Sequence, residues 1–194
     1  MSATKPDAQM LSAAKSVLEN LAGRAALPVN SGSAARTTRP NAQTAVIYAE
    51  GNFARPDGKT ANGLIRHSEK YDIVAVIDST KAGLDAGFEL DGENNGVPIF
   101  QNLGNALDGL ADRPDSFIFG MAPSSGVLSA SERRIVLSAI EHGLHVVNGL
   151  HEFLNDDAQF LAASATAGVT LLDIRRPPDK KNLHQFTGDI NTVT

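Results

Sequence analysis

The chain has 194 residues, of which 42% are hydrophobic and 20% charged, a composition typical of one well-cored globular domain. Its formal net charge of -5 argues against a general affinity for nucleic acid or anionic lipid. Because cysteine is absent, disulfides, thiolate zinc sites and a cysteine nucleophile are excluded. The sequence shows neither a membrane-spanning apolar run nor a signal-peptide pattern. We therefore expect a cytoplasmic protein whose partner is a small-molecule ligand, not nucleic acid or a membrane.

An amphipathic helix is predicted for an N-terminal extension, residues 1–27, where Asp7 can cap the helix and Gly23 can end it. The apolar positions that recur at helical spacing are Met10, Leu11, Ala14, Val17, Leu18 and Leu21. We expect this helix to pack on the domain or on a second subunit, which would make a homo-oligomer. Residues 28–43 have the composition of a flexible linker.

From residue 44 onward, short apolar runs alternate with segments of helical pattern. The runs predict six buried strands, at 44–49, 72–78, 97–100, 116–120, 144–148 and 169–174. The helical segments are 61–70, 102–110, 129–142 and 151–167, the last with a restart near Asp156. The stretch 79–96 is predicted to be irregular, because glycine and asparagine crowd its second half.

This alternation predicts an α/β class: a Rossmann-like, doubly wound and mostly parallel sheet over residues 44–190. We expect about six strands in the order 3-2-1-4-5-6. In that order the chain reverses direction between the first and fourth strands. A ligand should therefore lie where loop 50–60 faces loop 120–129, with loop 148–153 closing one side.

The loop after the first strand is a candidate anion-binding loop. It carries Gly51, Asn52 and Gly58, and Lys59 and Thr60 follow at the expected helix start. Free N–H groups and the helix dipole at such a position favour a phosphate or carboxylate. The glycine spacing matches neither the Gly-x-Gly-x-x-Gly fingerprint nor a P-loop. The alternative is a surface loop whose Gly-Lys-Thr segment only begins a helix.

The second strand ends in an acidic residue that has two interpretations. In dinucleotide-binding domains a carboxylate at the position of Asp78 accepts the ribose hydroxyls of NAD or another adenosine-containing ligand. With its neighbours Ser79 and Thr80, Asp78 thus predicts a nucleotide site. The alternative is that Asp78 caps the turn through Ser79 and Thr80.

The fourth strand is followed by Pro123, Ser124, Ser125 and Gly126. Two hydroxyls and exposed backbone amides suit an oxyanion or a phosphate. The segment is unlike the Gly-x-Ser-x-Gly nucleophile elbow, so hydrolase chemistry is not indicated. The alternative is a polar turn that leads into a capped helix.

The fifth strand leads into Asn148, Gly149 and His151. His151 is the best candidate for a catalytic general acid or base, because only histidine titrates near neutral pH without perturbation. The alternative is a structural histidine at a helix start. The other histidines show no spacing with carboxylates that indicates a metal site, so we expect none.

Four segments together resemble a known protein family: 48–53, 55–66, 76–83 and 147–154. They are similar to the N-terminal Rossmann-like domain of a prokaryotic two-domain family that also carries a C-terminal P-loop domain. Some members are D-glutamate N-acetyltransferases that use acetyl-CoA. The resemblance covers about residues 44–190, which makes 191–194 a tail where the P-loop domain would begin.

The resemblance implies acetyl-CoA as cofactor and N-acetyl transfer to an acidic D-amino acid. Such a reaction needs a base, for which His151 is the candidate, and oxyanion donors, for which loop 123–126 is the candidate. Lys59 would contact an anionic group. Two alternatives stay open: a nucleotide-binding or regulatory module without chemistry, which would use Asp78, and a domain whose role is association through its N-terminal helix.

Overall fold

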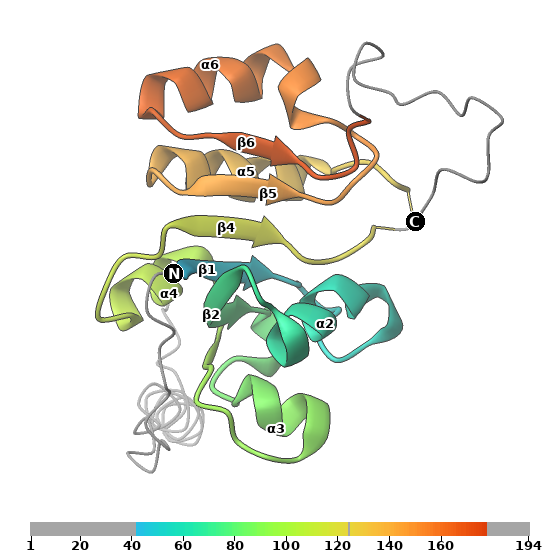
Figure 1. The fold of residues 1–194 in the computed structure, drawn as a ribbon, viewed down its shortest axis with the longest axis vertical. Coiled ribbons are helices and arrows are strands. Elements are labelled where there is room, and N and C mark those ends of the chain that lie inside the picture. Colours follow the sequence, from blue (N-terminus) through green and yellow to red (C-terminus); the bar gives the residue numbers. More distant parts are fainter. Residues whose placement is uncertain (1–41, 124, 178–194) are drawn as a thin grey trace, which may run out of the picture.

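The computed structural model describes residues 42–123 and 125–177. They form a Rossmann-like domain around one parallel sheet with the strand order β3-β2-β1-β4-β5-β6 (Figure 1). The predicted fold class and strand order are therefore confirmed. The predicted N-terminal helix, residues 28–41 of the linker and the tail 191–194 lie outside the described residues.

The strands are short and lie close to the predicted runs. They are β1 (Gln43–Tyr48), β2 (Tyr71–Ile77), β3 (Ile99–Phe100), β4 (Ser116–Phe119), β5 (His145–Asn148) and β6 (Leu171–Asp173). The α-helices are α2 (Lys59–His67), α3 (Ala86–Asp91), α4 (Leu103–Gly109), α5 (Ala130–Glu141) and α6 (Ala158–Ala167). Three 3-10 turns are η1 (Pro56–Gly58), η2 (Ser79–Lys81) and η3 (Leu154–Asp156).

The prediction that 79–96 is irregular was wrong, because the stretch contains η2 and α3. Asp85 caps α3: its Oδ1 accepts hydrogen bonds from the backbone N–H groups of Gly87 and Phe88. Its Oδ2 also accepts one from the N–H of Gly96, at 2.8 Å. The Asp85 carboxylate thus binds backbone N–H groups both at the start of α3 and at Gly96, after the helix. These hydrogen bonds offset the poor helix propensity of the glycines in this segment.

The predicted restart near Asp156 separates η3 from α6. Asp157 caps α6 by accepting hydrogen bonds from the N–H groups of Gln159 and Phe160. Residues 151–153 are not helical, so the predicted helix 151–167 begins later than expected. The predicted cap of α5 is present as a full capping box between Ser129 and Glu132.

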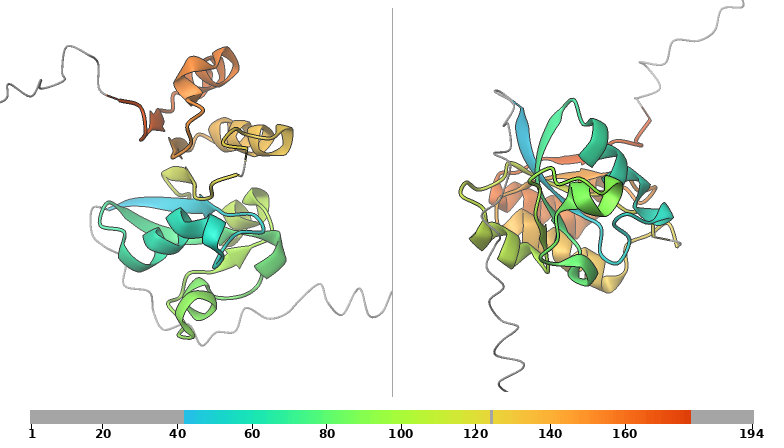
Figure 2. Two further views of the ribbon diagram at one scale, coloured as in Figure 1. Left: turned by 90° about the vertical axis from the view of Figure 1, so that its right-hand side faces the viewer. Right: turned by 90° about the horizontal axis from the view of Figure 1, so that it is seen from below.

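The helices are divided between the two faces of the sheet according to the direction of each crossover. Connections from β1 through β3 run toward one edge, and α2 and α3 pack on one face through Ala61 and Ala86. Connections from β3 through β6 run the other way, so α4, α5 and α6 cover the opposite face, where Phe160 is fully buried. The two views of Figure 2 show α5 and α6 on one side of β4–β6, with no described helix on the other side.

Candidate functional site

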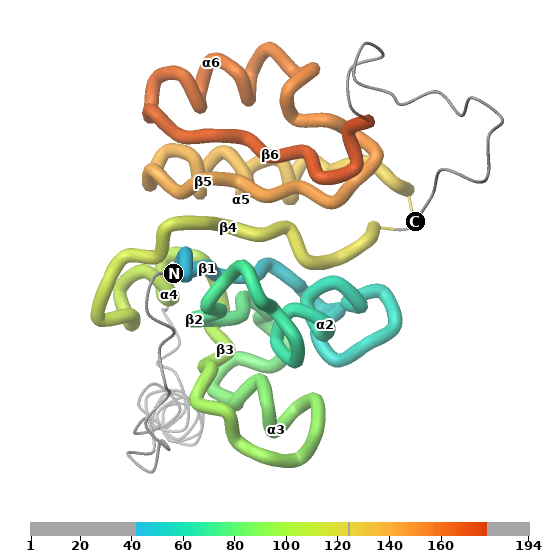
Figure 3. The backbone as a smooth tube through the Cα atoms, viewed as in Figure 1, coloured from blue at the N-terminus to red at the C-terminus, as the bar shows by residue number. Residues whose placement is uncertain are grey.

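The loops after β1 and β4 meet at the carboxyl edge of the sheet, where the strand order reverses (Figure 3). The N–H of Ala61, in the first turn of α2, donates to the carbonyl of Gly120 at 2.9 Å. The N–H of Ala122 donates to the carbonyl of Asp57 at 3.1 Å. The expected facing of loops 50–60 and 120–129 is thus present, at the position where doubly wound folds bind ligands.

The loop after β5 closes one side of this edge through Glu152. The Glu152 Oε2 accepts a hydrogen bond from the N–H of Leu128 at 2.6 Å. Its Oε1 lies 3.2 Å from the Arg133 Nη1, on α5. Arg133 also pairs with Asp157 at 2.7 Å and stacks over the Phe160 ring. Glu152 therefore ties the loop after β5 to the loop after β4.

The glycine loop is shaped by close backbone packing. Gly51 has a φ of +65°, in the left-handed region, and Gly58 is buried beneath the loop. A β-carbon on Gly58 would lie 2.1 Å from the carbonyl oxygen of Asn52. The Asn52 Nδ2 donates to the carbonyl of Glu50 at 2.8 Å. A residue that was not predicted, Asn62, accepts from the N–H of Ala54 and donates to the carbonyl of Arg55.

Substitution of Gly58 by alanine is expected to lower the free energy of unfolding by about 1–3 kcal/mol, because the added methyl group meets a buried carbonyl. The matched control is Gly63→Ala, inside α2, where a β-carbon has no neighbour within 4 Å. That substitution should raise stability by about 0.5–1 kcal/mol through helix propensity. Urea denaturation of both variants measures the difference; equal effects would contradict the packing argument.

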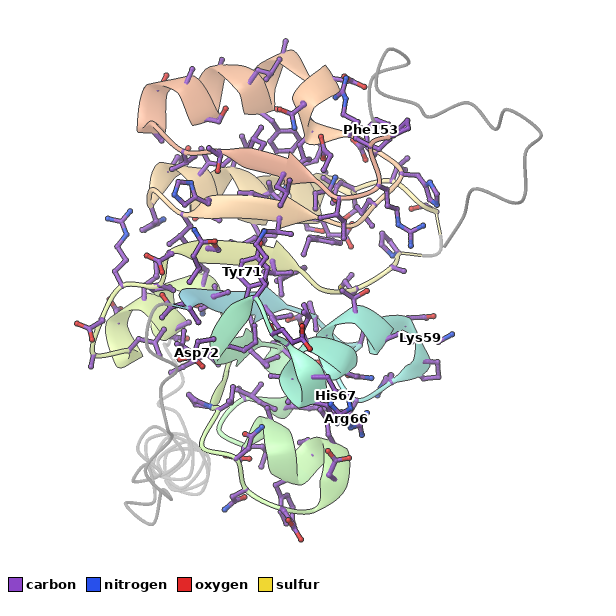
Figure 4. All side chains as sticks on the ribbon, viewed as in Figure 1. Lys59, Arg66, His67, Tyr71, Asp72 and Phe153 are labelled. Atoms are coloured by element: carbon purple, nitrogen blue, oxygen red, sulfur yellow. The ribbon has the colours of Figure 1, made fainter. Side chains whose placement is uncertain are left out.

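Lys59 and Thr60 begin α2 and are exposed. The labelled Lys59 points outward from the end of the helix (Figure 4). One N-terminal donor of α2, the N–H of Ala61, is already bonded to the end of β4. Lys59 and Thr60 thus remain accessible to an anion, and their role as ligand contacts stays a prediction.

Asp78 is fully buried at the end of β2. Its Oδ1 accepts from the N–H and the hydroxyl of Thr80, at 2.9 and 2.6 Å, and its Oδ2 accepts from the N–H of Phe53 at 3.1 Å. This is the geometry of the turn-capping alternative. Ser79 donates its N–H and its hydroxyl to the Glu50 carboxylate, a contact that the sequence pattern did not indicate. Two acids, Asp78 and Glu50, lie next to the end of β2, and of these two Glu50 is the one that reaches solvent.

The electrostatic environment beneath this edge is negative. Burial raises the pKa of Tyr48 to about 12, and the nearby carboxylates of Glu50, Glu132 and Asp78 add to that rise. The Tyr48 ring packs against Phe119, with centroids 5.5 Å apart. The phenol therefore stays protonated at neutral pH.

The loop after β4 forms a tight turn. The N–H of Gly126 donates to the carbonyl of Pro123 at 2.9 Å, and Gly126 has a φ of +73°. The Ser125 hydroxyl donates to the carbonyl of Val127 at 2.9 Å. Ser124 lies outside the described residues. The Ser125 hydroxyl thus has a local partner, and the predicted oxyanion role of this loop stays a prediction.

Asn148 holds the end of β5 in place. Its Oδ1 accepts from the N–H of Leu150, and its Nδ2 donates to the Glu152 carbonyl and to Asp173, both at 2.7 Å. Asn148 is buried, whereas Gly149 is half-buried. A structural role for Asn148 thus accompanies its predicted place in the site.

His151 is exposed at the carboxyl edge. Its Nε2 lies 3.1 Å from the Arg175 Nη1, just after β6. Because a guanidinium can only donate, Nε2 is the acceptor and the imidazole is neutral in this contact. No sequence spacing indicated that Arg175 meets His151.

Asp173, at the end of β6, binds several donors at once. Its carboxylate accepts from the side chains of Asn148 and Asn155 and from the N–H groups of Leu154 and Asn155. Burial alone would raise its pKa, but these hydrogen bonds outweigh burial and hold the pKa below the ordinary aspartate value. The carboxylate therefore stays ionised and anchors the loop that carries His151.

Within residues 42–123 and 125–177, no group of three or more histidine and acidic side chains lies close enough to hold a metal ion. None of the described helices combines the length and apolarity that crossing a bilayer requires.

An apolar cavity of about 160 Å³ reaches the carboxyl edge, where Thr60 and Gly149 line it.

Comparisons with known proteins agree with this architecture. Residues 79–177, just over half of the chain, match the family model "Domain of unknown function (DUF1611_N) Rossmann-like domain". A crystal structure of a DUF1611 family protein from Anabaena variabilis is 30% identical, with a TM-score of 0.62, over 71% of this chain and 38% of that one.

Two curated relatives are named D-glutamate N-acetyltransferase. The protein from Pseudoalteromonas sp is 39% identical over 62 residues, and that from Tritonibacter scottomollicae is 31% identical over 62 residues. Each match covers 32% of this chain but only 19% of the relative, so this chain spans a small part of those proteins. On the family match and the shared architecture, the chain belongs to the DUF1611_N family of Rossmann-like domains.

Proposed function

We propose that this chain is the Rossmann-like ligand-binding domain of a D-glutamate N-acetyltransferase-like protein that uses acetyl-CoA. The observation that carries the proposal is the meeting of three loops at the switch point, through the Ala122–Asp57 and Leu128–Glu152 hydrogen bonds. The name shared by the two curated relatives supports the choice of substrate and cofactor. Fold alone would not, because Rossmann-like sheets host many functions.

The reaction requires a neutral amine to attack the thioester carbonyl. A C–N bond forms and the C–S bond breaks, a base takes one proton from the amine, and that proton is passed to the CoA thiolate as it leaves. His151 is the proposed base, since its neutral Nε2 has a lone pair directed toward Arg175. A substrate carboxylate that pairs with Arg175 would draw the guanidinium away and free Nε2 for the amine proton.

Charged and polar groups at the carboxyl edge of the sheet are proposed to bind different parts of the two substrates. Lys59 and Arg175 are exposed cations that suit carboxylates and the CoA phosphates. The backbone of loop 123–126 is the proposed oxyanion donor.

The alternative is an NAD-like nucleotide-binding module without chemistry. It depends on a carboxylate at the tip of β2 that can accept ribose hydroxyls. Both oxygens of Asp78 already accept protein hydrogen bonds, and the residue is fully buried. A ribose bound there would have to displace the N–H of Phe53 or of Thr80, which favours the acetyl-CoA proposal.

Calorimetric titration with acetyl-CoA, NAD and D-glutamate, each alone, followed by an acetyl-transfer assay, tests the proposal. We expect acetyl-CoA to bind and N-acetylglutamate to form. Acetyl-CoA binding without product would keep the ligand assignment and refute turnover by this chain alone. NAD binding without acetyl-CoA binding would replace the proposal by the nucleotide module.

Lys59→Ala is expected to weaken acetyl-CoA binding about tenfold, equal to ~1.4 kcal/mol, because a charge-assisted contact to a phosphate is lost. Arg113→Ala is the matched control: Arg113 is also an exposed cation, but it precedes β4 at the opposite edge of the sheet. Calorimetry on both variants measures the effect. Equal weakening would point to general charge attraction and remove Lys59 from the site.

A further inference from the structure

One half of one sheet face carries no described helix. On the side of α2 and α3, strands β4–β6 are uncovered, because the helices that connect them lie on the opposite face (Figure 2). Leu172 and Ile174 are 41% and 57% exposed there, whereas Ile118 and Val147 at the floor are buried. In a doubly wound sheet both faces are ordinarily covered.

This uncovered half forms a continuous groove, called here the open groove. Its apolar part is the cavity lined by Leu64, Tyr71, Ile118, Val147, Leu172 and Ile174. A second cavity, of about 390 Å³, shares Tyr71, Val147 and Leu172 with the first and extends to Gln43 and His145 at the amino edge. The open groove thus runs along β5 from one edge of the sheet to the other. In Figure 4 the labelled Tyr71 lies over the strands on this side.

We propose that the open groove is the docking site of this chain's own N-terminal segment, residues 7–22. The sequence gives that segment an apolar stripe of Met10, Leu11, Ala14, Val17, Leu18 and Leu21 at helical spacing. A helix with this stripe would supply the missing layer over β4–β6 and would cover Leu172 and Ile174.

The dimensions of the groove fit one helix. Five residues of extended chain, His145 to Gly149, span about 16 Å. A helix from Met10 to Leu21 would span about 18 Å with a diameter of about 10 Å. Three strands are about 10–14 Å across, so the groove covers on the order of 200 Å². A stable dimer buries about 800 Å² per partner, which this groove alone does not offer.

The point at which the chain enters the domain favours the same occupant. Gln43, the first residue of β1, lines the amino end of the open groove. Residues 23–42 connect it to the segment, and a flexible linker of this length spans about 25 Å on average. Tethering at that distance gives an effective concentration on the order of millimolar, so even a weak contact would be populated.

The absence of native cysteine allows a direct test by disulfide trapping in the full chain. The double variant Leu18→Cys with Leu172→Cys is oxidised with glutathione disulfide, and products are separated on a non-reducing gel. The matched control is Leu18→Cys with Leu161→Cys, because Leu161 is 43% exposed on α6 on the opposite side of the sheet. A second pair, Ala14→Cys with Leu172→Cys, samples the neighbouring helical turn.

We expect at least one test pair to form an intramolecular disulfide at least tenfold faster than the control pair, at a rate independent of protein concentration. Adding Leu11→Asp should return that rate to the control value, because it places a charge on the apolar stripe. Rates equal to the control for both pairs would overturn the proposal. A covalent dimer whose yield rises with concentration would overturn it in favour of a second copy.

Discussion

Replacement of Asp173 by alanine is expected to lower the free energy of unfolding by about 3–5 kcal/mol. Asp173 is buried at the end of β6 and accepts hydrogen bonds from Asn148, Leu154 and Asn155. Without the carboxylate these donors keep their buried positions but lose their acceptor. Each unpaired buried donor costs about 1–3 kcal/mol. The loss should also loosen the turn η3 and the loop before it.

Chemical denaturation of Asp173→Ala at neutral pH measures this effect. The matched control is Asp156→Ala, since Asp156 pairs with Arg176 at 2.9 Å with its side chain 58% exposed. A surface ion pair contributes only about 0–1 kcal/mol, so the control should be nearly neutral. Equal losses for the two aspartates would show that the hydrogen bonds around Asp173 add nothing to stability.

The Asp173 carboxylate should also make the free energy of unfolding depend on pH in the acidic range. Hydrogen bonding holds the pKa of folded Asp173 below its usual value, so the unfolded chain takes up the proton first as pH falls. The contribution of Asp173 is therefore complete above about pH 4 and is lost as pH falls through the folded pKa. Asp173→Asn should flatten this part of the stability curve. An unchanged slope below pH 4 would contradict the assignment.

Much of the fold could be predicted because its strands are continuous apolar runs. Most of these runs are buried on both faces of the parallel sheet, as in β2 and β4, so no alternation was needed to find them. The helix α3 could not be found in this way. Its cap depends on Asp85, which also bonds the N–H of Gly96 eleven residues away, and local propensity carries no such information.

The candidate site was only partly predictable, for a related reason. The position of Asp78 at a strand end follows from the sequence, but the direction of its carboxylate depends on Phe53, twenty-five residues earlier. The contact of Glu50 with Ser79 and that of His151 with Arg175 likewise join loops far apart in the chain. Sequence patterns thus located the edge of the sheet but not the partners of its side chains.

His151→Ala is expected to lower kcat for acetyl transfer by about 10²–10⁴-fold, because a positioned base contributes that much to proton transfer. The affinity for acetyl-CoA should stay unchanged, since the imidazole acts on the amine and not on the cofactor. The matched control is His142→Ala. His142 is exposed at the end of α5, at the opposite edge of the sheet, where its Nδ1 lies 2.7 Å from the Ser138 carbonyl.

The Arg175→Ala variant distinguishes two roles of Arg175: binding a carboxylate of the substrate and orienting the His151 imidazole. If Arg175 pairs with a substrate carboxylate, its loss should raise KM for D-glutamate about tenfold or more and reduce kcat much less than His151→Ala does. Steady-state kinetics on the three variants measures these effects.

Wild-type kcat in His151→Ala would remove His151 as the base. Equal losses of kcat in His151→Ala and His142→Ala would show a general effect of histidine removal. A lower kcat in Arg175→Ala with unchanged KM would indicate that Arg175 acts only by orienting the imidazole, through the 3.1 Å contact to its Nε2.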